Sequence, residues 1–147
     1  MVVVNLYNEI YRLLTNDDDV LNYLGIDTSM DEGSVLLQKA RKVQKRRRPQ
    51  NPVDNVPLIT FYTPGGGADQ GNYMVFNSPF VFDVYTNDDV DLAQRLSSHL
   101  VGLLARKNHP MCGVESYETK LLDAFESSTD LSNVYCFTAV IRFSVTI

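Results

Sequence analysis

Apolar residues recur along the chain at two spacings, and each spacing predicts one kind of element. Near the start, four residues separated by four, three and one positions form a single stripe: Leu6, Ile10, Leu13 and Leu14. This spacing is typical of an amphipathic helix, for which Asn5 is the expected N-cap. Further on, the apolar residues Val20, Leu21 and Leu24 predict a second short helix. Gly25 follows them and is expected to end it.

Residues 88–107 give the clearest helix prediction. They carry a stripe of five leucines at helical spacing: Leu92, Leu96, Leu100, Leu103 and Leu104. Asn87 is the expected cap, and three aspartates near the start match the positive end of the helix dipole. Because the dipole already explains Asp88, Asp89 and Asp91, we do not interpret them as acid–base catalysts.

Strict alternation of side chains predicts a long strand over residues 134–147. One of its faces is apolar at every second position: Tyr135, Phe137, Ala139, Ile141, Phe143, Val145 and Ile147. Residues 117–126 also read as a strand, and the turn-rich residues 127–133 would join the two as an antiparallel hairpin. Earlier strands are expected at residues 56–63, 73–76 and 80–85, with a bend or bulge at residues 77–79.

The segment 26–55 admits two interpretations. Ser29 and Glu32 have the spacing of a capping box, which would start a helix. Its inner positions would be Leu36, Ala40 and Val43, and its remaining face would be strongly basic. An extended arm is the alternative, since adjacent like charges and the prolines that follow disfavour a continued helix.

The order of elements predicts an α+β fold in a single domain over residues 1–147. We expect a mostly antiparallel sheet of about four to five strands. Two main helices would pack on one face of this sheet, and the basic segment would form an extended or helical arm. A chain of 147 residues is long enough to bury one ordinary core.

The net charge of −5 conceals a strong asymmetry. Residues 38–48 contain no acid and seven of the thirteen basic residues: Lys39, Arg41, Lys42, Lys45, Arg46, Arg47 and Arg48. The rest of the chain has six basic and eighteen acidic residues, a net of −12. Opposite charges divided in this way favour contact between copies of the protein or with a neighbour.

No pattern in the sequence predicts catalytic, cofactor or metal chemistry. The loop of residues 64–72 holds Gly65, Gly66 and Gly67, but no phosphate-binding lysine follows, and we expect a mobile loop. The acidic residues 17–19 lack the pattern of a calcium loop and are expected to form a helix cap or charged turn. His99 and His109 lack partners at ligand spacing, and His99 is expected to be solvent-exposed.

Two cysteines, Cys112 and Cys136, are too few for a disulfide framework and are expected to be free thiols. No apolar run approaches the roughly 20 residues that span a bilayer, so we expect no membrane contact. The basic run has two interpretations. It is either a solvated or subunit-bridging segment or a nucleic-acid contact, although it contains no aromatic residues for base stacking.

Several short strings together resemble one known family. PLITFY at residues 57–62 is followed by FVFDVYT at residues 80–86. A helix then opens with DDV at residues 88–90, and STD at residues 128–130 joins the last two strands. This order resembles the tail-terminator, or tail-completion, proteins of long-tailed bacteriophages. The resemblance covers residues 5–24 and 56–147, whereas the basic segment 26–55 departs from it.

The resemblance implies a non-enzymatic virion protein, assembled in the host cytoplasm, that forms a ring, expected to be hexameric, at the head-proximal end of the tail. Such a ring ends polymerisation of the tail-tube protein and docks the tail to the head-completion or connector protein. Transient contact with genomic DNA in the lumen is also expected. Contacts between subunits or with partners are assigned to the seven basic residues and to Gly65, Gly66 and Gly67. The alternatives are another neck ring (head-completion or stopper protein) or, less favoured, a nucleic-acid-binding module that uses residues 39–48.

Overall fold

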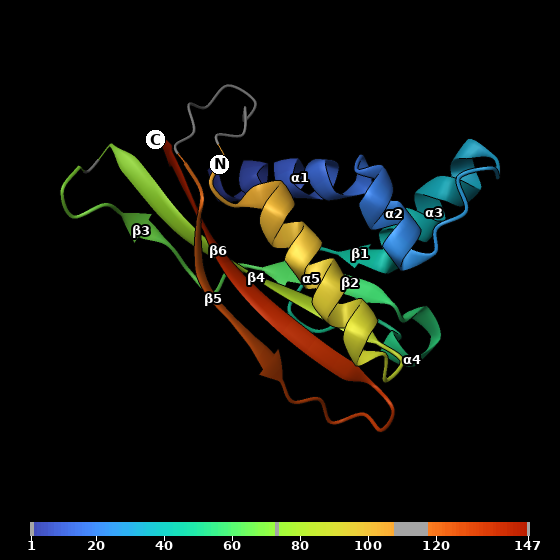
Figure 1. Ribbon diagram of the computed structural model, residues 1–147. Coiled ribbons are helices and arrows are strands. Elements are labelled where there is room, and N and C mark those ends of the chain that lie inside the picture. Colours follow the sequence, from blue (N-terminus) through green and yellow to red (C-terminus); the bar gives the residue numbers. More distant parts are fainter. Residues whose placement is uncertain (1, 73, 108–117, 147) are drawn as a thin grey trace.

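The computed structural model describes residues 2–72, 74–107 and 118–146. Its elements follow in the order α1 (Val2–Thr15), α2 (Asp18–Leu24), α3 (Glu32–Lys42), β1 (Val43–Gln44), α4 (Pro52–Asn55), β2 (Leu58–Tyr62), β3 (Gly67–Ala68), β4 (Val75–Thr86), α5 (Val90–Leu104), β5 (Lys120–Ser127) and β6 (Tyr135–Thr146). Helices α1, α2 and α5 lie on one side of a sheet (Figure 1). The α+β fold is thus confirmed, with two strands only two residues long.

The sheet has the strand order β1-β2-β4-β6-β5, and β3 pairs with the far end of β4. Only β1 and β2 pair in parallel; the other neighbouring strands are antiparallel. The centre is the twelve-residue pairing of β4 with β6, from Val75 opposite Thr146 to Thr86 opposite Tyr135. The predicted hairpin of the last two strands is confirmed, and β5 is left as one edge of the sheet.

Aromatic residues fill the layer between the sheet and the helices. Phe61, Phe80, Phe82 and Phe143 are fully buried, because their strands alternate and turn these positions towards the helices. Tyr7 of α1 stacks on this cluster, and its hydroxyl accepts a hydrogen bond of 2.8 Å from the Thr63 amide. Burying one such phenylalanine stabilises the fold by roughly 1.5–3 kcal/mol.

The helices carry the predicted stripes, but two of the expected caps are wrong. Helix α1 already begins at Val2, so Asn5 lies inside the helix and is exposed. Helix α5 is capped by Asp89 instead of Asn87, and the Asp89 carboxylate accepts a 3.0 Å hydrogen bond from the Leu92 amide. A carboxylate in this place satisfies an amide that the helix itself leaves unpaired and also favours the dipole.

The bend expected at residues 77–79 is also wrong, because β4 is continuous through Pro79. Proline lacks an amide hydrogen and is tolerated where one flank of a strand has no partner. On the β2 side, the last paired residue of β4 is Val81, and β3 resumes pairing only at Asn77. Pro79 lies between these two positions, while its other flank faces Arg142 of β6.

In segment 26–55 the helical interpretation is correct, but the expected inner face is wrong. Helix α3 is capped by Asp31, whose carboxylate accepts from the Ser34 amide, and not by Ser29. Leu36 is 59% exposed, and Val43 is buried in β1 after the helix has ended. The reason is position: α3 lies at the β1 edge of the sheet (Figure 1), where Leu36 and Leu37 stay 59% and 58% exposed.

Candidate functional site: two opposed surfaces

The seven basic residues lie on two consecutive pieces of the chain at the β1 edge of the sheet. Lys39, Arg41 and Lys42 occupy the last turn of α3, where cations interact favourably with the negative end of the helix dipole. Lys45, Arg46, Arg47 and Arg48 follow β1 in an irregular loop. The charges therefore surround one end of the sheet instead of forming a continuous stripe along a helix.

Two of the lysines are held by contacts within the chain. The Lys42 ammonium donates a 2.9 Å hydrogen bond to the Asn55 carbonyl, and partial burial lowers the pKa of Lys42. The Lys45 ammonium donates to the Asn8 side chain at 3.1 Å and lies 5.2 Å from the centre of the Tyr11 ring. These two residues connect the basic segment to α1 and α4, and so have a structural role.

Arg47 is a third residue with a contact inside the chain, since its guanidinium lies 5.5 Å from the centre of the Tyr62 ring. The remaining four, Lys39, Arg41, Arg46 and Arg48, have no side-chain hydrogen bond or ring contact to any residue of the described ranges. Within those ranges, none of the seven basic residues has a carboxylate within 4 Å. Positive charge at this edge therefore remains available for a partner.

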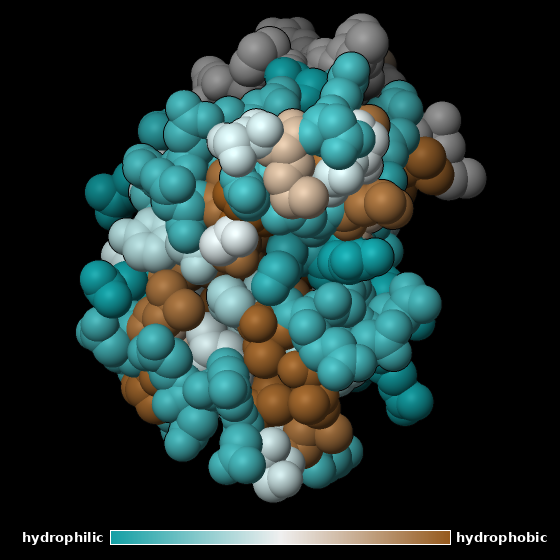
Figure 2. Space-filling model, turned by 90° about the vertical axis from the view of Figure 1, so that its right-hand side faces the viewer, coloured by the Kyte–Doolittle hydropathy of each residue, from teal (hydrophilic) through white to brown (hydrophobic). Residues whose placement is uncertain are grey.

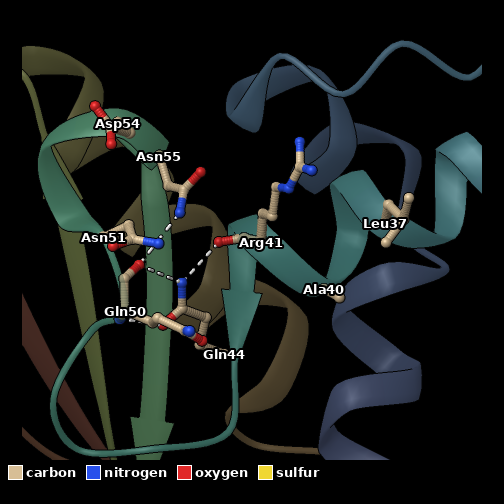
Figure 3. A pocket seen from close by; sticks show the side chains of 8 residues that line it. All are labelled: Leu37, Ala40, Arg41, Gln44, Gln50, Asn51, Asp54 and Asn55. Carbon is tan, nitrogen blue, oxygen red and sulfur yellow. Dashed lines mark hydrogen bonds between the residues drawn. The ribbon is translucent and has the colours of Figure 1, made fainter.

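A buried glutamine closes the loop that carries these charges (Figure 3). The Gln44 side chain donates to the carbonyls of Arg41, at 2.8 Å, and Gln50, at 3.2 Å. It also accepts a 2.7 Å hydrogen bond from the Gln50 amide. An open cleft of about 570 Å³ lies beside it, and its ionisable lining residues are Arg41 and Asp54. One cation and one carboxylate on an open wall do not form a catalytic pair.

The opposite edge of the sheet, β5, is apolar and acidic. Leu121, Leu122 and Phe125 are 44%, 51% and 43% exposed, although they belong to a strand. Asp123 and Glu126 are exposed beside them. The outer flank of β5 pairs with no described strand, and a β-bulge interrupts its pairing with β6 between Leu121 and Asp123.

The face that carries α3 and α4 is mostly hydrophilic, with separate apolar groups that reach the surface (Figure 2). Three exposed apolar residues belong to these two helices: Leu36, Leu37 and Val53, at 59%, 58% and 64% exposure. Leu37 and Arg41 line the same cleft, so apolar and basic side chains adjoin here. This combination of an apolar centre with charged neighbours is typical of protein–protein contact surfaces.

The glycine-rich loop contains a short strand. Gly67 and Ala68 form β3 opposite Asn77 and Phe76 of β4. A Cβ atom on Gly66 would lie 2.5 Å from the Asn77 carbonyl oxygen, so the close approach of the two chains requires glycine there. The Asp69 carboxylate accepts from the Asn77 side chain at 3.0 Å. The mobility expected of residues 64–72 stays a prediction.

His99 is partly buried and paired, which corrects the expectation that it is solvent-exposed. Its Nε2 lies 2.7 Å from the Asp17 carboxylate, and Asp19 brings a third potential metal ligand within 4.8 Å. Asp17 is confirmed as the cap of α2, since the same oxygen accepts from the Val20 amide at 3.1 Å. Capping and the contact between α2 and α5 account for this cluster. His109 lies outside the described residues.

A buried polar cluster lies on the sheet face away from the helices. The Thr138 hydroxyl donates a 2.5 Å hydrogen bond to Asp83, and burial raises the pKa of this carboxyl. Cys136 is a free, buried thiol whose pKa burial raises to about 12. A thiol with this pKa is protonated at neutral pH and is a poor nucleophile. Cys112 lies outside the described residues.

The sequence pointed to the basic residues but not to the apolar edge on β5 or to the contact between Asp17 and His99. The signal for the β5 edge was the mixed polarity of residues 117–126, which suits an edge better than the centre of a sheet. No local sequence pattern predicts the contact between Asp17 and His99, because 82 residues separate the two.

Comparison with known proteins supports the fold. No protein-family model matches the sequence, and no curated protein matches it. Among solved structures, this chain is similar to one from a structure described as the virion of a native gene transfer agent (GTA) particle. The two chains are 14% identical with a TM-score of 0.66, over 97% of this chain and 95% of that one. At this identity the likeness shows a shared fold.

None of the described helices is long and apolar enough to cross a membrane.

Proposed function

We propose that the chain is a structural protein of a tailed-phage or phage-like virion. In this proposal it forms a ring at the head-proximal end of the tail, ends polymerisation of the tail tube and docks the tail to the head. The observation that carries the proposal is the fold it shares, almost from end to end, with a chain of a gene transfer agent virion particle. The sequence strings at residues 57–62 and 80–86 lead to the same class of protein.

The surfaces of the molecule are consistent with a role in assembly. Basic residues without acidic partners in the described ranges occupy one edge of the sheet, and exposed apolar residues occupy the other. A contact between two different surfaces of identical subunits produces a ring when the rotation between neighbours closes. We therefore propose a homo-oligomeric ring, with six subunits as in the family that the sequence resembles.

The ring would have two further partners, the tail-tube protein and the head-completion or connector protein. We assign partner contacts to the exposed basic residues and to the hairpin at Gly65, Gly66 and Gly67. Arg48, which has no side-chain contact in the described chain, would also suit transient contact with genomic DNA in the lumen, since arginine neutralises phosphates. Because all of these partners are parts of a virion, we propose that the protein is located in the virion.

Another neck ring, a head-completion or stopper protein, remains the main alternative, because the shared fold favours neither position. A nucleic-acid-binding module is less favoured, since Lys42, Lys45 and Arg47 are held by contacts within the chain. Filter binding at moderate salt separates this module from a neck protein. Retention of DNA by the unassembled protein at micromolar concentration, lost in the Arg46→Ser, Arg48→Ser variant, would favour the module, because DNA contact in a neck ring requires the assembled lumen.

Deletion of the gene in its parent particle tests the proposed position. Without a terminator, tube polymerisation has no stop, and electron microscopy should show tails of uncontrolled length. Normal-length tails that accumulate beside unattached heads would overturn the terminator role in favour of another neck position. Complementation with the wild-type gene is the control, and the length distribution of at least several hundred tails is the readout.

A further inference from the structure

We infer that neighbouring subunits meet through the two opposite edges of the sheet, so that the β5 edge of one copy docks on the α3 end of the next. The β5 surface consists of Leu121, Leu122, Asp123, Phe125 and Glu126. The α3 surface consists of Leu36, Leu37, Lys39, Arg41 and Arg46. This inference rests on the proposed ring and names the contact that would build it.

The apolar residues of the two surfaces need a partner of the same kind. On β5, Leu121, Leu122 and Phe125 are between 43% and 51% exposed, and on α3, Leu36 and Leu37 are 59% and 58% exposed. Burying apolar area is the main favourable contribution to association. Leu121 and Phe125 lie opposite Ile141 and Thr138 and therefore point to opposite faces of the sheet, so a neighbour that docks along the β5 edge would contact apolar side chains on both faces.

The charges favour contact of the β5 surface with the α3 surface over contact between two copies of the same surface. Asp123 and Glu126 place one acid on each face of β5, and Lys120 at the start of the strand is the one cation of the strand. The α3 surface is basic, and its Arg41 and Arg46 have no acidic partner in the described chain. If two β5 edges met around a two-fold axis, acids would face acids, which is destabilising. Contact between β5 and α3 brings opposite charges together.

The positions of the two surfaces suit a ring. In the strand order β1-β2-β4-β6-β5, the basic end follows β1 and the acidic edge is β5, so the full width of the sheet separates them. Figure 1 shows β5 at one side of the molecule and α3 at the other. A head-to-tail contact of this kind leaves one free surface at each end of every open chain, until the ring closes.

The contact is made by side chains and does not extend the sheet. The bulge at Leu122 interrupts the regular spacing of β5, and bulges and charged residues discourage strand addition at an edge. At the other end, the Gln44 side chain and the loop that it closes at Gln50 lie beside β1. The docking surface there is α3 and its flanking loop.

Two charge-reversed variants test the assignment. The acidic edge is reversed by Asp123→Lys with Glu126→Lys, and the basic end by Arg41→Glu with Arg46→Glu. Each variant alone has two surfaces of like charge, and we expect its half-assembly concentration to rise by tenfold or more. In an equimolar mixture, however, each surface again faces one of opposite charge. The mixture should therefore form rings in which the two variants alternate, and native mass spectrometry would find equal numbers of both.

A matched control reverses two exposed acids outside both surfaces, Asp18→Lys with Asp91→Lys, and should assemble like the wild type. Circular dichroism establishes that every variant is folded. If either interface variant alone forms rings as readily as the wild type, the assignment is wrong although the ring stands. Mixtures that stop at one-to-one dimers would mean that like surfaces meet, β5 on β5 or α3 on α3. Folded variants that stay monomeric when mixed would also overturn the pairing. A wild-type protein that never assembles would overturn the ring itself.

Discussion

Replacing Leu122 with serine tests the apolar part of the proposed subunit contact. Leu122 lies at the bulge of β5 and is 51% exposed, so about half of its surface is available to a neighbour. Burying a whole leucine side chain is worth about 1.5–3 kcal/mol, which leaves about 0.8–1.5 kcal/mol for the exposed half. The variant should therefore weaken each contact by about 4- to 13-fold in its dissociation constant.

A closed ring amplifies this loss. In a hexamer, six contacts are lost or weakened together, and the equilibrium depends on the sixth power of the monomer concentration. The concentration at half-assembly then rises with the six-fifths power of the change per contact, which gives about 5- to 20-fold. Sedimentation velocity over a series of protein concentrations measures this midpoint directly.

The stability of the monomer should change much less than the assembly midpoint. Substitutions at exposed positions usually alter the free energy of unfolding by about 0.5 kcal/mol or less, and urea titration of the monomer at low concentration measures this. Val90→Ser is the matched control, because Val90 is 41% exposed at the start of α5 and belongs to neither surface. An unchanged midpoint for Leu122→Ser, or an equal shift for Val90→Ser, would refute the reasoning.

Three further predictions concern the fold that carries the two surfaces. Gly66→Ala should lower the free energy of unfolding by about 1–3 kcal/mol, because the new Cβ would lie 2.5 Å from the Asn77 carbonyl oxygen. Gly67→Ala, whose new Cβ would have no atom within 4 Å, should be nearly neutral when both variants are unfolded in urea. Gln44→Ala removes three part-buried hydrogen bonds to the main chain and should cost about 1–3 kcal/mol by thermal or urea unfolding. A smaller loss would mean that water replaces the side chain. Since the pKa of Asp83 is raised, the folded protein holds this proton to higher pH than the unfolded chain, and the stability that this group contributes falls as pH rises from about 4 through the raised pKa. Asp83→Asn should therefore be more stable than wild type at pH 7 but not at pH 4. An equal difference in stability at both pH values would contradict this.

Elements whose cause is local could be predicted from the sequence. The leucines of α5 and the alternation along β6 each follow from one face being turned to the core, and both elements were found with boundaries displaced by one to three residues. Pro79 misled the prediction because the cost of a proline depends on which flank of the strand is paired. That information comes from β2 and β3, which lie elsewhere in the sequence.

Helix α3 shows why an apolar side chain is not a sufficient sign of burial. The sequence allowed a helix here but predicted the wrong cap, and Leu36 is exposed because nothing in the described chain covers this part of the helix. The short parallel pairing of Val43 with Ile59 of β2, sixteen residues away, ends the helix and directs the basic loop around the sheet edge. A pairing of two residues leaves almost no pattern in the sequence.

The candidate site was predicted in composition but not in arrangement. Counting charges identified residues 38–48, but only the tertiary structure separates the basic residues with contacts inside the chain from those without. Lys42 belongs to the first group through the Asn55 carbonyl, and Arg41 and Arg46 belong to the second. The acidic partner surface on β5 is more than seventy residues further along the chain. This surface matters because β5 is an edge strand of the sheet, and the position of a strand within the sheet is set by the tertiary structure.

The two kinds of side chain at each edge have different effects on assembly. Apolar contacts are not directional and would by themselves allow two β5 edges to meet, whereas charges act against that pairing and favour contact between β5 and α3. The exposed apolar area on β5 is small and divided between two faces of the strand, and the net charge of −5 keeps free monomers apart. We therefore expect weak association in dilute solution and efficient closure where subunits are already concentrated. A ring that must form at the end of a finished tube, and not elsewhere, benefits from this balance.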